Sequence, residues 1–197
     1  MMSDSHTEPQ DDTAAAANMR SPYAVKLFEK IPQIAEDMAS RPVNETSPAF
    51  LKALLRGETP EEAVTFAAYA LTPRYAVWWA HECLQAISDH LTDEDRAMLG
   101  LCAAWAADPD EPNRYAAMDA GLAAPEPGPG AWVAMAAGWS SGSIAPPDQP
   151  EVPVQPFMCA RAVNGGVLSG LARVPVDQRR RKLAHFISMA EVLARNA

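Results

Sequence analysis

Residues 71–89, LTPRYAVWWAHECLQAISD, decide the fold class of this chain. Thr72 followed by Pro73 is a typical helix start, and at about 100° per residue the stretch forms a helix with two unlike faces. The apolar stripe of that helix consists of Ala76, Trp79, Ala80, Cys83, Leu84 and Ile87. The opposite, polar stripe consists of Arg74, His81, Gln85, Ser88 and Asp89. The stretch therefore predicts an amphipathic helix with one buried face.

Trp78 lies in the middle of the polar stripe. A large aromatic side chain in that position must be covered by another part of the chain or by a partner. Arg74, one turn earlier, has the spacing to stack on the indole. Two kinds of cover are possible for the Trp78 indole: a later proline of this chain (Pro146, Pro147 or Pro150), or a segment of another protein. We expect the prolines, because indole–proline packing would explain both the tryptophan and the loop that carries them.

The rest of the chain also has the character of a helical protein. Among its 197 residues alanine is abundant, whereas β-branched and aromatic residues are sparse, which favours helices over sheets. The 18 prolines, together with repeated start and stop signals, divide the chain into short helices. The sequence predicts an all-α fold, an irregular helical bundle or short helical array, with a long proline-rich loop over residues 140–156. We expect the helices at residues 22–29, 32–40, 48–56, 60–70, 73–90, 93–107, 112–122, 131–138, 158–171 and 176–196.

The ends of the chain and its cysteines bear on domain organisation and location. Residues 1–20 are acidic and lack amphipathic order, so we expect a disordered acidic tail, followed by a single all-α domain over residues 21–197. The three cysteines lie among apolar neighbours without paired spacing, which is typical of buried, reduced thiols. No signal peptide is recognisable, and no apolar run reaches the roughly 18–20 residues of a membrane span. We therefore expect a cytoplasmic protein without membrane insertion.

The net charge of −9 argues against nucleic acid as a partner. One basic tract, Arg179–Arg180–Arg181–Lys182, has the charge to bind phosphate or an acidic protein. The alternative interpretation is a solvated first turn of the last helix, and this is the one we favour.

The sequence patterns that could carry catalysis are incomplete. Residues 138–142, GWSSG, match G-x-S-x-G, but a nucleophile elbow needs a β-strand before the serine, and here a helical stretch precedes it. His81–Glu82 begins the zinc motif H-E-x-x-H, yet no second histidine follows. The adjacent acids at 61–62 and 93–95 are explained by helix capping. We predict no catalytic residue, no metal site and no cofactor.

A rival hypothesis predicts a ligand pocket. In that hypothesis the chain is an enzyme or small-ligand binder, and the pocket lies between the 73–90 helix and the 140–156 loop. His81, Glu82 and Ser140 would supply its polar groups.

Three segments together resemble an uncharacterised bacterial domain family. They are TPRYAVWWA (72–80), SGSIAPPDQPEVP (141–153) and ARAV (160–163), and the resemblance covers roughly residues 45–195. Tyr75 stands where relatives are expected to carry a glutamate, so a pairing of that glutamate with an arginine would be missing here. Some members of the family lie near type VI secretion gene clusters in Proteobacteria, which implies an accessory or adaptor role.

From the residues and the resemblance we expect a non-enzymatic, cytoplasmic interaction or adaptor protein whose partner is another protein. The resemblance adds the expectation of an accessory of a bacterial type VI secretion system. The predicted interaction surface consists of Arg74, Trp78, His81, Pro146, Pro147 and Asp148.

Overall fold

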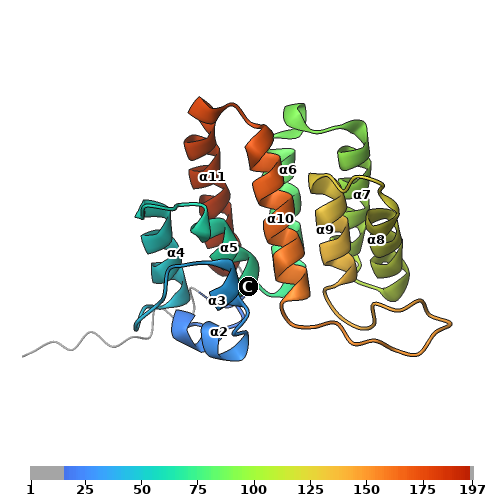
Figure 1. The fold of residues 1–197 in the computed structure, drawn as a ribbon, viewed down its shortest axis with the longest axis horizontal. Helices are drawn as coiled ribbons and strands as arrows, with labels where there is room; N and C mark the ends of the chain where they lie inside the picture. The colour runs from blue at the N-terminus through green and yellow to red at the C-terminus, as the bar shows by residue number, and fades with distance from the viewer. Residues whose placement is uncertain (1–15, 196–197) are drawn as a thin grey trace, which may run out of the picture.

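The structure is a computed structural model that describes residues 16–195, and these residues form an all-α fold (Figure 1). Isolated β-bridges are the only β-pairing in this part of the chain. The prediction of an all-α fold with a long proline-rich loop is confirmed. The helices, in chain order, are α2 (Ala24–Lys30), α3 (Ile34–Asp37), α4 (Ser47–Arg56), α5 (Glu62–Ala70), α6 (Pro73–Gln85), the 3-10 turn η1 (Ser88–His90), α7 (Asp93–Ala107), α8 (Glu111–Ala123), α9 (Pro129–Gly138), α10 (Met158–Arg173) and α11 (Val176–Arg195).

Helix α6 contains the stretch that decides the fold and packs against α7, α9, α10 and α11. Every residue of its predicted apolar stripe is buried. Trp79, at the centre of that stripe, donates its indole N–H to the carbonyl of Phe186 at 2.8 Å, which ties α6 to α11. The helix ends at Gln85 rather than at residue 90, because the chain tightens into the turn Ser88–His90.

Helix α9 lies between α8 and α10 in Figure 1 and packs against α7, α8 and α10. Every residue of α9 except Trp132 is buried, as expected for a short helix that is apolar on all sides. Gly138 at its end allows close contact with α8, because a Cβ there would collide with the side chain of Met118. Small residues thus set the distance between these two helices.

A buried carboxylate connects α7, α9 and α10. Asp95 forms a capping box with Thr92, accepts the N–H of Gly130 at 2.9 Å and receives Arg173 Nη1 at 2.5 Å. Burial alone would raise the pKa of Asp95, but these hydrogen bonds and the Arg173 charge outweigh it and hold the pKa below its ordinary value. Asp95, one of the acids predicted to serve the first turn of this helix, therefore also joins three helices.

Helices α2 to α5 come first in the chain and form one part of the fold. Every residue of α5 after Glu62 is buried, and α5 packs against α4, α10 and α11. Among the described residues, no side chain caps the start of α5, so the capping predicted for the acids at 61–62 is wrong. The Glu62 carboxylate instead accepts the backbone N–H groups of Ala39 and Ser40, so that it caps the chain after α3.

The start of the domain differs from the prediction. The predicted disordered tail, residues 1–20, falls outside the described residues up to residue 15, but residues 16–20 are described and pack on the domain. The N–H of Asn18 donates to the Ala194 carbonyl at 3.2 Å, and the N–H of Arg20 donates to Ala70 at 2.7 Å. Met19 is buried beside them. The boundary at residue 21 is therefore corrected, because this short segment buries apolar side chains and bonds to both α5 and the end of α11.

Residues 139–157 connect α9 to α10 without helix and form the loop at the lower right of Figure 1. Among the helices of residues 16–195, none combines the length and apolar character needed to cross a bilayer.

Candidate functional site

The six residues of the predicted surface fall into two separate places. Arg74 and Trp78 line a groove of about 400 Å³ between α6 and α7, together with Tyr75 and three alanines of α7. Pro146 and Pro147 line a larger pocket between the loop and α8. The lining of neither hollow includes a residue of the other.

Trp78 lies on the least buried face of α6, as the helical wheel predicts, but its cover is not the predicted one. The ring of His81 stacks on the indole, with 4.8 Å between ring centroids and 13° between planes. Alanines of α7 lie beside it in the groove. The expected cover by Pro146, Pro147 or Pro150 is wrong, because the loop packs against α8 instead.

Two other predictions for α6 are also corrected. Arg74 does not turn to the indole: its Nε donates to the Ala106 carbonyl at 2.8 Å, where it caps the end of α7. His81, predicted on the surface, is only 7% exposed and lies within hydrogen-bond distance of Glu82. Its neighbours on α6 surround the ring: Trp78 stacks on it, and Glu82 and Gln85 lie within hydrogen-bond distance of its two ring nitrogens.

The proline-rich loop is held by one buried cation. Arg114 on α8 is 1% exposed. Its Nη1 donates to the carbonyls of Gly138 at 2.7 Å and Ser143 at 3.0 Å, which lie before and within the loop. Its Nε and Nη2 donate to both oxygens of Glu111 at 2.8 and 2.7 Å. A side chain from α8 thereby fixes both the end of α9 and the first part of the loop.

The loop has its own backbone pairing. The N–H of Ile144 donates to Val152 at 2.9 Å, and the N–H of Val154 donates to Gly142 at 3.1 Å. Ser143 Oγ accepts the N–H groups of Ala145 and Val152, each at 3.0 Å. Gly142 adopts φ 69° against the Arg114 guanidinium, a conformation that favours glycine. These bonds close residues 142–154 into a short irregular hairpin.

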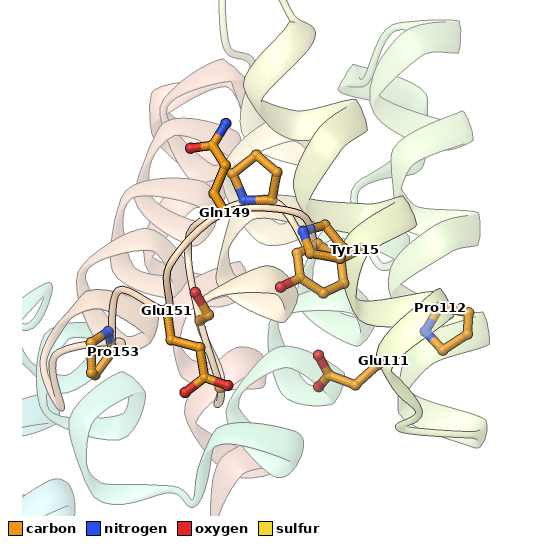
Figure 2. Close-up of a pocket in the computed structure, with 10 residues that line it drawn as sticks. Glu111, Pro112, Tyr115, Gln149, Glu151 and Pro153 are labelled. Carbon is orange, nitrogen blue, oxygen red and sulfur yellow. The ribbon is translucent and has the colours of Figure 1, made fainter.

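The hairpin and α8 enclose a pocket of about 800 Å³. Figure 2 shows Glu111, Pro112 and Tyr115 of α8 on one wall, and Gln149, Glu151 and Pro153 of the loop on the other. The carboxylates of Glu111 and Glu151 reach toward the same opening from these opposite walls. The Tyr115 hydroxyl donates to the Ala145 carbonyl at 3.0 Å and fastens the loop to α8. The remaining lining residues are Gly142, Ser143, Pro146 and Pro147.

The pocket has an acidic opening over a buried positive charge. The side chain of Glu111 is 61% exposed, and the Arg114 guanidinium lowers the pKa of that carboxyl below its usual range. Glu111 in turn raises the pKa of Arg114, which stays charged. Asp148, the sixth predicted surface residue, is exposed in the loop but does not line the pocket.

Only part of the rival hypothesis, a ligand pocket beside the loop, agrees with the structure. The pocket beside the loop exists, but it faces α8 rather than α6, and His81, Glu82 and Ser140 do not line it. Ser140 follows helix α9 rather than a strand, and its hydroxyl is buried without a hydrogen-bond partner. The structure therefore does not bring these three residues together in that pocket.

The three cysteines are buried, as the sequence predicts. Cys83, Cys102 and Cys159 are buried and unpaired, and burial raises the pKa of each thiol, to about 12 for Cys102 and Cys159. Within residues 16–195, His, Cys, Asp and Glu form no group of three or more that would hold a metal ion.

Two of the four residues in the basic tract 179–182 bond to the ends of other helices, and the other two are exposed. Arg179 donates to two carbonyls at the end of α10, at 2.6 and 2.8 Å, and Lys182 donates to a carbonyl at the end of α6 at 2.7 Å. Arg180 and Arg181 are exposed. Two of the four charges thus cap helix ends, where a cation is favourable.

The sequence analysis missed the residues that build the pocket on α8. Glu111 and Arg114 are three residues apart, the spacing at which a helical ion pair forms, and Asp110 before them caps the helix by accepting the N–H of Asn113 at 2.8 Å. That spacing was a visible signal. Nothing in the sequence shows that Arg114 also reaches the carbonyls of a loop some thirty residues later.

Comparisons with known proteins give a family and no function. No curated protein and no solved structure matches the chain. One family model matches residues 50–194, which include α6, α8, the proline-rich loop and α10. The chain therefore belongs to DUF6931, a family of unknown function.

Proposed function

We propose that this chain is a non-enzymatic interaction or adaptor protein, and that its docking face is formed by residues 139–157 together with the first turns of α8. We call this surface the loop face. The observation that carries the proposal is that the loop is exposed yet fixed. Its residues 146–153 are all exposed, while Arg114, Tyr115 and the hairpin bonds hold it in one conformation.

A fixed, exposed loop is suited to binding for a physical reason. Association costs free energy whenever a flexible segment must be ordered, and proline has little backbone freedom left to lose. Loops held by a rigid scaffold are where proteins commonly carry their binding residues. A loop anchored to α8 at two points, Ser143 and Ala145, and bonded within itself therefore binds a partner at low entropic cost.

The chemistry of the pocket favours binding over catalysis. Its titratable side chains are Glu111, Tyr115 and Glu151. Glu111 is engaged by Arg114 through both oxygens, and the hydroxyl of Tyr115 is engaged by Ala145. The described lining therefore offers no pair of free acid and base groups poised for proton transfer.

The setting of this role rests on the family resemblance. We propose a cytoplasmic accessory of a bacterial type VI secretion system, in which the loop face binds another protein of that apparatus. Three buried, unpaired thiols are consistent with a reducing compartment.

Site-directed photo-crosslinking tests the proposal. A photoreactive benzoyl-phenylalanine replaces Asp148 in the loop and, as a matched control, the exposed Asp89 in the turn between α6 and α7. In the cells that produce the protein, we expect a discrete protein adduct from position 148 and none of that mass from position 89. No adduct from position 148, or the same adduct from both positions, would contradict the loop face.

A further inference from the structure

The pocket of the loop face is rich in hydrogen-bond acceptors and poor in donors. Four of its ten lining residues are prolines, which have a carbonyl acceptor but no N–H donor: Pro112, Pro146, Pro147 and Pro153. The carboxylates of Glu111 and Glu151 add acceptors only.

The donors that the pocket does contain are mostly committed. The hydroxyl of Tyr115 donates to Ala145, which leaves its oxygen as an acceptor. Arg114, beneath the pocket, uses four of its five N–H donors in hydrogen bonds to Glu111, Gly138 and Ser143. Among the side chains of the lining, the amide of Gln149 and the hydroxyl of Ser143, which accepts two N–H groups, are the donors that remain.

The charges of the loop and of α8 also favour a positively charged occupant. Residues 139–157 contain no lysine, arginine or histidine, and Arg114 is the one basic residue within α8. Asp148 and Glu151 are exposed in the loop, and Figure 2 shows Glu151 facing Glu111 across the opening. An occupant that brings donors and positive charge complements this pocket.

We infer that the pocket binds an arginine side chain in an extended segment of the partner protein; this inference rests on the proposed function. The guanidinium lies at the opening, where Glu151 accepts two of its N–H groups. The Glu111 carboxylate, whose charge is already paired with Arg114, offers only its remaining acceptor positions. The aliphatic stem packs on the proline rings and on Tyr115. Arginine fits better than lysine because its planar fork matches a carboxylate and its weak hydration suits an apolar wall.

The test uses the peptide Gly-Arg-Gly-Arg-Gly-amide with fluorescein on its N-terminus, and the same peptide with citrulline in place of arginine. Citrulline keeps the shape and removes the charge. The full chain is titrated into each peptide and the fluorescence anisotropy is measured. Glu151→Gln tests the site, and Asp89→Asn, in the turn between α6 and α7, removes the same charge from an exposed position.

We expect the arginine peptide to bind the wild-type chain and the citrulline peptide to bind at least about tenfold more weakly, because charge-assisted hydrogen bonds are lost. Glu151→Gln should weaken binding by about tenfold, and Asp89→Asn by less than about twofold. Equal weakening by the two variants would overturn the inference, since it would show general attraction to an acidic protein. Equal binding of both peptides, or a Kd above about 1 mM for the arginine peptide, would overturn it as well.

The crosslinking at position 148 separates this inference from the proposed function. A partner adduct without arginine-dependent peptide binding would leave the loop face intact and overturn the arginine pocket. Absence of the adduct would overturn the loop face itself, whichever peptide binds.

Discussion

Replacing Arg114 by methionine removes the donors that hold the proline-rich loop while keeping an apolar stem of similar length. The carbonyls of Gly138 and Ser143 would then lose their partner, the first in a buried and the second in a partly buried position. A buried acceptor without a partner costs about 1–3 kcal/mol, so we expect Arg114→Met to lower the free energy of unfolding by about 2–4 kcal/mol. Glu111 adds little to this figure, because its side chain is 61% exposed and water replaces the lost hydrogen bonds.

Urea denaturation measures the stability, and amide hydrogen exchange measures the loop. The N–H groups of Ile144 and Val154, which are bonded within the hairpin, should exchange faster in Arg114→Met than in the wild type. Glu111→Gln is the control: it keeps the bonds from Arg114 to the two carbonyls and retains one side-chain oxygen as an acceptor, so it should cost less than Arg114→Met. The reasoning is refuted if Arg114→Met costs no more than Glu111→Gln, or if exchange in the hairpin is unchanged.

Four further predictions follow from the packing and the buried charges. Gly138→Ala should lower the free energy of unfolding by about 1–3 kcal/mol through collision with α8, whereas Gly100→Ala, which meets nothing within 4 Å, should raise it by up to about 1 kcal/mol, both by urea denaturation. Trp79→Ala should cost about 3–5 kcal/mol and Trp78→Ala about 1–2 kcal/mol, because Trp79 is fully buried and hydrogen-bonded while Trp78 is half-buried; similar losses would contradict the two assignments. Asp95→Asn should cost about 2–3 kcal/mol at pH 7. Because the folded pKa of Asp95 lies below its ordinary value of about 3.9, this difference should shrink as the pH of the unfolding experiment falls below about 4. The three buried thiols should not react with Ellman's reagent in the folded protein and should all react in urea.

The sequence was informative about helices because their signals are local. The 71–89 wheel placed the buried stripe of α6 and the position of Trp78 on its least buried face. Thr92 and the acids after it predicted the start of α7 for the same reason. Capping and periodicity depend on residues within one or two turns, so a single sequence reveals them.

The errors at Glu62, Arg74 and the proline-rich loop have a common physical cause, since each concerns a contact between distant segments. Glu62 has the spacing of a capping residue for its own helix, yet it bonds to the chain after α3. Arg74 and the prolines have the chemistry to cover Trp78. In the structure Arg74 instead bonds to the end of α7, and the proline-rich loop packs against α8.

The same limit applies to the candidate site. Pro146 and Pro147 were recognisable from composition, and they do line the pocket. The other wall, with Glu111 and Tyr115, was not recognisable, because it depends on the hydrogen bonds that Arg114 makes to the loop. A local pair at spacing three gives no hint of which distant carbonyls it reaches.

The order of the loop is the most direct test of the loop face. Backbone ¹⁵N relaxation of the full chain gives order parameters for the Ile144 and Val154 amides, which can be compared with those of α8 and α9. The fixed hairpin predicts values of about 0.8, close to those of the helices. Values below about 0.6 at both amides would show a flexible loop and contradict the account.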